Sequence, residues 1–109
     1  MTETKLISYI ITDFISKGEM RMAEISWQEI INKYSDKFKK AGALRQTISR
    51  IWDKDNVYRL GHHWEYRDDS AFKECQKIFK LAEKEFKKET GIVWKIYSNR
   101  GIIISETNF

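Results

Sequence analysis

The sequence AGALRQTISRIWDKDNVYRLGHHWEYR, residues 41–67, changes its hydrophobic period partway along, and this change decides the predicted fold. Over residues 41–53 the apolar side chains recur every three to four residues, which is typical of an amphipathic helix. Over residues 57–67 apolar and polar side chains alternate, and Gly61 with the two histidines after it would form a turn. We therefore expect a helix followed by a β-hairpin.

Two further helices are expected on the N-terminal side of this stretch. Residues 4–17 carry apolar side chains at helical spacing, and Gly18 stands where a helix often ends. Ser26 and Glu29 match a capping box, in which the serine oxygen accepts from a helical amide and the glutamate returns a bond. A second helix is thus predicted to begin at Trp27 and to end near Tyr34.

A long helix and a second hairpin are expected on the C-terminal side. Asp68 and its acidic neighbour suit the start of a helix that runs to about Thr90, where Gly91 ends it. Apolar side chains then alternate over residues 92–97 and 102–105, around a turn at residues 98–101. The predicted class is therefore α+β.

Composition limits the class of protein. A length of 109 residues with 41% hydrophobic residues suits a single domain, residues 1–109, with one core, in which the four tryptophans are expected to pack. No apolar run approaches the roughly 20 residues that span a bilayer, and no secretory signal is evident, so a cytoplasmic protein without a membrane partner is expected. Cys75 is the only cysteine, which excludes an internal disulfide and a Cys-rich zinc site. No metal and no cofactor are predicted.

The positive charge is concentrated in the centre of the sequence. Residues 37–67 hold eight Lys and Arg against three acidic residues, whereas the whole chain has a net charge of +4. The rest of the chain is therefore close to neutral. Such a local excess of positive charge is typical of a surface that binds a polyanion.

The order helix, capped helix, basic helix and hairpin wing resembles the winged helix-turn-helix superfamily over residues 4–67, with residues 68–109 as an extension. The residues that carry the resemblance are 26–29, 43–50 and 57–67. The resemblance implies a recognition helix in the major groove of double-stranded DNA and a wing along its backbone. It also implies a small, sequence-preferring transcriptional regulator of phage or mobile-element origin.

The site residues implied by this resemblance fall into three groups. The base contacts would be Arg45, Gln46, Ser49 and Arg50. The backbone contacts would be Lys37, Lys39, Lys40, Thr47 and Lys54. The wing contacts would be Arg59, His62, His63 and Arg67.

The sequence also allows three other interpretations. The same scaffold would serve a protein-interaction module, such as an inhibitor of a host nucleic-acid enzyme, because winged helices serve both purposes. A nuclease that uses Glu65, Asp68 and Asp69 ranks last, because the aspartates are explained as helix-start residues, and no enzyme is predicted. The apolar seam of the long helix would pack either on the domain's own sheet or on a second copy in a homodimer. This seam comprises Phe72, Cys75, Phe79, Ala82 and Phe86.

Overall fold

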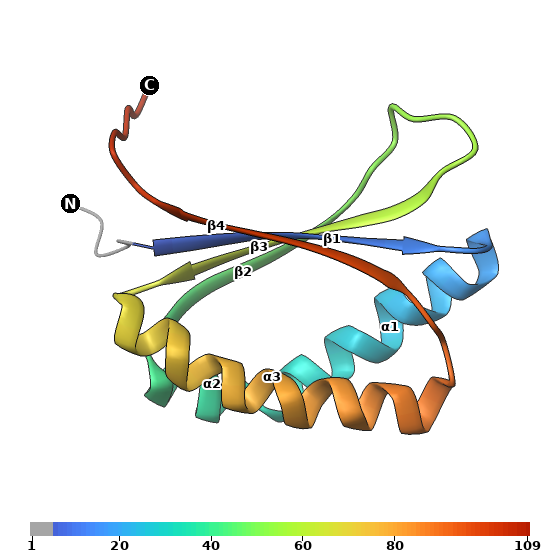
Figure 1. Ribbon diagram of the computed structural model, residues 1–109, viewed down its shortest axis with the longest axis horizontal. Helices are drawn as coiled ribbons and strands as arrows, with labels where there is room; N and C mark the ends of the chain where they lie inside the picture. Colours follow the sequence, from blue (N-terminus) through green and yellow to red (C-terminus); the bar gives the residue numbers. More distant parts are fainter. Residues whose placement is uncertain (1–5) are drawn as a thin grey trace.

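The chain folds into a four-stranded antiparallel sheet with all of its helices on one face (Figure 1). The structure is a computed structural model that describes residues 6–109. The elements in chain order are β1 (Leu6–Phe14), α1 (Lys17–Lys33), α2 (Ser35–Ala41), β2 (Ala43–Arg50), β3 (Tyr58–Tyr66), α3 (Asp69–Thr90) and β4 (Lys95–Ile102). The strands lie in the order β2-β3-β1-β4. The predicted α+β class is confirmed, but the predicted winged helix-turn-helix fold is wrong.

The segment predicted as the first helix is the central strand β1. Its side chains alternate, so that Ser8, Thr12 and Phe14 are buried under the helices while Tyr9 lies on the opposite face. β-Branched isoleucines and threonine favour an extended backbone, and two strands hydrogen-bond to β1, one on each side. The first two residues of the predicted helix, at positions 4 and 5, lie outside the described residues.

The second predicted helix is only the later part of α1. The helix begins ten residues earlier than expected, because Ser16 accepts a hydrogen bond from the Glu19 amide at 3.1 Å. Gly18, predicted to end a helix, lies in the first turn of this one. The predicted capping serine, Ser26, lies in the middle of the helix and bonds Glu89 of α3 instead.

The predicted recognition helix and wing are both absent among the described residues. Residues 43–50 form strand β2, and residues 58–66 form one continuous strand, β3, where the sequence suggested two short strands and a turn. Gly42 makes the sharp change of direction from α2 into β2 with a φ of 106°, a conformation that favours glycine. Local spacing alone did not distinguish a helix from an edge strand over residues 43–50.

Helix α3 is confirmed with its predicted ends. The carboxylate of Asp68 accepts a hydrogen bond from the Ala71 amide at 2.8 Å, and Gly91 ends the helix in a left-handed conformation. The C-terminal hairpin is wrong, because residues 95–102 form the single edge strand β4, which runs antiparallel to β1.

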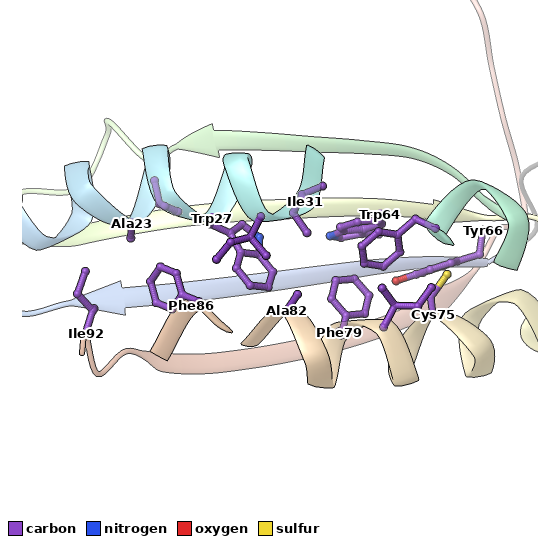
Figure 2. Packing of buried hydrophobic residues seen from close by; sticks show 14 of the residues in the cluster. Ala23, Trp27, Ile31, Trp64, Tyr66, Cys75, Phe79, Ala82, Phe86 and Ile92 are labelled. Carbon is purple, nitrogen blue, oxygen red and sulfur yellow. The ribbon is translucent and has the colours of Figure 1, made fainter. Parts of the chain in front are cut away.

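The hydrophobic core lies between the helices and the covered face of the sheet. Figure 2 shows Phe79, Ala82 and Phe86 of α3 directed toward Trp27 of α1 and Trp64 of β3. The rings of Phe38, Trp64 and Phe79 are in mutual contact, with centroids 4.7–5.0 Å apart. No helix formed by residues 6–109 lies on the opposite face of the sheet (Figure 1).

Candidate functional site: a cavity between the sheet and the helices

The residues predicted to read DNA bases lie on strand β2. Arg45 and Ser49 belong to the open face of the sheet, and Gln46 and Arg50 belong to the covered side, because side chains alternate along a strand. Thr47 is on β2, Lys37, Lys39 and Lys40 are on α2, and Lys54 is in the β2–β3 loop. These residues therefore form no helical surface that a major groove would accept.

The central excess of positive charge is largely compensated in three dimensions. Each arginine within residues 37–67 has a carboxylate partner. Two of these carboxylates, Glu24 and Asp13, precede residue 37 in the sequence. The ion pairs are Arg45–Glu65, Arg50–Glu24, Arg59–Asp13 and Arg67–Asp68. The Arg59–Asp13 pair has two hydrogen bonds, of 2.6 and 3.0 Å, and the Arg59 guanidinium lowers the pKa of Asp13. The charge pattern was therefore a poor guide to an anion-binding surface.

The two predicted wing histidines lie on opposite faces of β3. His62 is under the helices and only 4% exposed, whereas His63 stacks on the Tyr9 ring of β1 at 4.8 Å on the open face. They do not share a ligand. No group of three or more His, Cys, Asp or Glu side chains within residues 6–109 is placed to hold a metal ion.

The apolar seam of α3 packs on the chain's own sheet. Cys75, Phe79, Ala82 and Phe86 are buried, and Phe72 is half-buried against the Tyr66 ring. Of the two packing modes left open by the sequence, the structure shows the one within the chain. Burial raises the pKa of the Cys75 thiol to about 11, so the sulfur is a protonated core group at neutral pH.

A cavity of about 160 Å³ opens between α3 and the strands β1, β3 and β4. Its aromatic and aliphatic walls are Ile10, Trp27, Trp64, Phe72, Phe79, Trp94 and Ile96. Its polar groups are Ser8, Thr12, His62, Gln76, Glu83, Ser98 and Arg100. Ligand sites typically combine mostly apolar walls with a few polar groups in this way.

A buried polar pair lies in the wall of the cavity. Thr12 Oγ1 and His62 Nε2 are 3.1 Å apart across the β1–β3 ladder. Burial lowers the pKa of His62 to about 4, so the imidazole is neutral at pH 7. The pair therefore presents hydrogen-bonding groups to the cavity without a charge.

Three of the four tryptophans of the chain line this cavity. Trp94 stacks on Phe86 with ring centroids 4.4 Å apart and meets Trp27 edge-on at 5.5 Å. The fourth, Trp52, is 90% exposed in the β2–β3 loop, so its predicted place in the core is wrong. The sequence did not indicate the cavity, although Ser8 and Thr12 stand as buried polar residues within an otherwise apolar alternation in β1.

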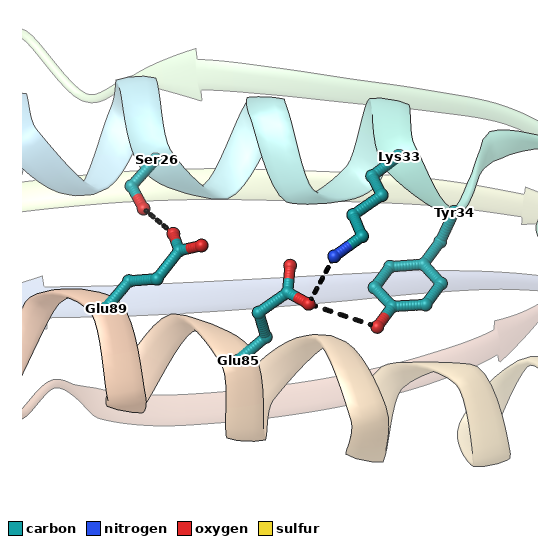
Figure 3. Close-up of polar contacts among 5 residues, drawn as sticks. All are labelled: Ser26, Lys33, Tyr34, Glu85 and Glu89. Carbon is teal, nitrogen blue, oxygen red and sulfur yellow. Dashed lines mark hydrogen bonds and ion pairs between the residues drawn. The ribbon is translucent and has the colours of Figure 1, made fainter.

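Polar contacts also join α1 and α3, two of the helices that cover the sheet. Figure 3 shows Glu85 accepting hydrogen bonds from Lys33 at 2.8 Å and from the Tyr34 hydroxyl at 3.3 Å. The Lys33 ammonium lowers the pKa of Glu85, and Glu85 raises that of Lys33. Because Lys33 is exposed, this ion pair contributes little to stability.

Solved structures of the same fold are ferredoxin-like. A dimeric ferredoxin-like protein from an uncultured marine organism is similar over 97% of this chain and 100% of its own, with 27% identity and a TM-score of 0.86. A second such protein, also from an uncultured marine organism, is 22% identical over 95% and 99% of the two chains, with a TM-score of 0.80. A putative antibiotic biosynthesis monooxygenase from Deinococcus radiodurans is 11% identical over 95% and 97%, with a TM-score of 0.70.

These similarities overturn the functional prediction made from the sequence. The fold is not a winged helix, so neither the recognition helix nor the DNA-binding regulator that depended on it is supported. No helix within residues 6–109 is long and apolar enough to cross a membrane.

Comparison of the sequence with protein-family models identifies a family for this chain. No curated protein matches the chain. Residues 3–103 match the family model described as "Domain of unknown function (DUF6974)". Because this match covers almost the whole chain, the protein belongs to the DUF6974 family.

Proposed function

We propose that the protein binds a small molecule with an aromatic ring in the cavity between α3 and the sheet. The observation that carries this proposal is the cavity itself, with its aromatic walls and its buried Thr12–His62 pair. A packed core contains few voids larger than a water molecule. The half-open cavity of about 160 Å³ between aromatic rings, at the edge of this core, is therefore space that a ligand would fill.

The volume limits the size of the ligand. A cavity of roughly 150 Å³ lined by apolar side chains is known to hold one benzene molecule. The cavity of about 160 Å³ in this protein suits one six-membered ring with a small substituent. The edges and faces of Trp27, Trp64 and Trp94 offer such a ring the offset and edge-to-face contacts that aromatic groups prefer.

The chemistry of the cavity favours binding over acid–base catalysis. A general base works best with a pKa near the operating pH, and the pKa of His62, about 4, lies well below it. We therefore give His62 a hydrogen-bonding role toward the ligand. The expectation that the protein is not an enzyme stays a prediction.

A monooxygenase is the second candidate function. It is favoured by the ferredoxin-like fold shared with the putative antibiotic biosynthesis monooxygenase, together with the aromatic cavity. Oxygen uptake measured with an electrode, in the presence of phenols that bind the cavity, separates the two candidates. Uptake that scales with protein concentration and yields an oxygenated product would replace the binding function by catalysis.

The open face of the sheet is proposed to bind a second copy of the chain. Its centre is apolar, with Tyr9 51% and Tyr97 49% exposed beside Ile7 and Ile11. Nε2 of His63 is buried on this face and has no hydrogen-bond partner among the described residues. The relative with 27% identity is described as dimeric. Light scattering after size exclusion should give twice the chain mass, and Ile11→Lys should give the single chain.

Tryptophan fluorescence provides the test of ligand binding. In a Trp52→Phe background the three remaining tryptophans all line the cavity, so a bound aromatic ring should quench or shift their emission. Ser98→Phe would place a ring at the cavity wall from the exposed edge strand and should block the response. If a panel of single-ring aromatic compounds at millimolar concentration leaves the emission unchanged, the proposed function is wrong.

A further inference from the structure

We propose that the ligand of this cavity is a single-ring aromatic carboxylate whose carboxylate group binds Arg100. This inference rests on the proposed function and names its ligand class. It follows from three observations: the position of Arg100, the separation of charges along the cavity, and the neutrality of the buried polar pair.

Arg100 lies in the cavity wall with its charge available. Its guanidinium carbon lies 4.8 Å from the centroid of the Phe72 ring, and no carboxylate within residues 6–109 forms an ion pair with it. This distinguishes it from the four arginines of residues 45–67, each of which has a carboxylate partner. A guanidinium that stacks on a ring keeps the N–H groups of its edge free, and that edge matches the two oxygens of a carboxylate.

The two ends of the cavity differ in charge. Helix α3 and strand β4 run in opposite directions, and two contacts fix their alignment: Arg100 on Phe72, and Trp94 on Phe86. Glu83, three residues before Phe86, therefore lies toward the Trp94 end of the cavity. Eleven residues of helix from Phe72 to Glu83 correspond to a rise of roughly 16 Å. The carboxyl of Glu83 is thus too distant to repel an anion at Arg100 strongly.

The interior of the cavity allows only one negative charge on the ligand. Between Arg100 and Glu83 the groups that face the cavity are aromatic and aliphatic side chains, hydroxyls, the Gln76 amide and the neutral His62 imidazole. A second ionised group placed among them would lose its hydration without gaining a counter-ion. A benzoate-like molecule satisfies both requirements, because its charge is at one end and its ring is apolar.

The test compares benzoate with benzamide, which has nearly the same shape and no charge. Titration of the Trp52→Phe protein, followed by fluorescence, should show benzoate binding about tenfold more tightly or better, as expected for a charge-assisted pair of hydrogen bonds. Arg100→Gln should abolish this preference, whereas Arg100→Lys should retain part of it. Lys95→Gln is the matched control, because it removes one positive charge from the same strand on the opposite face.

The outcomes separate this inference from the proposed function. Equal affinity for benzoate and benzamide, unchanged in Arg100→Gln, would overturn the carboxylate site while the cavity would still bind aromatic rings. An equal loss of benzoate affinity in Lys95→Gln and Arg100→Gln would also overturn it, because the effect would then be one of net charge. If benzoate, benzamide and phenol all fail to bind, both the inference and the proposed function are wrong.

Discussion

Lowering the pH from 7 to 4 is expected to destabilise the protein through one buried side chain, His62. Its native pKa is about 4, and its ordinary value in an unfolded chain is 6.5. At pH 7 both states are neutral at this position. As the pH falls below 6.5 the unfolded chain binds a proton that the native state excludes, so the stability present above pH 6.5 is lost progressively down to about pH 4.

The size of this effect follows from the two pKa values of His62. Each pKa unit corresponds to about 1.4 kcal/mol. A difference of about 2.5 between the values of 6.5 and about 4 then gives a loss of about 2 kcal/mol at pH 5 and about 3 kcal/mol at pH 4. This is a large part of the stability of a typical small domain.

Urea unfolding at pH 7, 6, 5 and 4, followed by tryptophan fluorescence, measures this loss. The carboxyls of Asp13 and Glu85, whose pKa values are lowered by their ion pairs, add a loss of their own at the acid end. His62→Gln removes only the histidine contribution, so the difference in unfolding free energy between wild type and this variant should shrink by about 3 kcal/mol from pH 7 to pH 4. His63→Gln keeps the buried imidazole and should follow the wild type. A constant difference between wild type and His62→Gln at all four pH values would show that the buried His62 imidazole does not cause this pH dependence.

Three further predictions concern stability and reactivity. Gly42→Ala should cost about 2 kcal/mol or more, because φ is 106° and the added Cβ would lie 2.6 Å from Cβ of Ala71; an unchanged melting temperature would contradict this. Arg59→Gln should lower the urea concentration at the midpoint of unfolding by loss of its two hydrogen bonds to Asp13, and the difference from wild type should shrink in 1 M salt. Cys75 is fully buried, so at pH 7 it should react with a disulfide reagent only as fast as the chain unfolds; immediate labelling would show that the thiol is accessible.

The elements that the sequence predicted correctly are those whose signals are local. Helix α3 has a capping aspartate, a long amphipathic seam and a terminal glycine, all within 24 residues of one another, and each favours the same helix. In β1 the local signals conflicted, because isoleucines on both faces of the strand imitate a helical stripe. Both faces of β1 carry apolar side chains because one face packs under the helices and the other is the centre of the open face.

The candidate site was missed for a related reason. The cavity residues come from β1, β3, α1, α3, β4 and, for Trp94, the α3–β4 loop, and no short motif contains more than a few of them. Thr12 and His62 are 50 residues apart and meet only because β1 and β3 are neighbours in the sheet. The positive charge that was prominent in the sequence is compensated by carboxylates such as Glu24 and Asp13, which only the fold brings to Arg50 and Arg59.

Caps and helical periodicity act between residues a few positions apart, so the α+β class, helix α3 with both of its ends, and the burial of its apolar seam were predictable from local patterns. That residues 6–14 and 43–50 are strands, which histidine is buried, and where a cavity remains follow only from the assembled fold. Strand pairing and burial depend on partners distant in the chain. The free energies of strand pairing and of burial are therefore set by the assembled sheet and its helices. They cannot be predicted from a local sequence pattern.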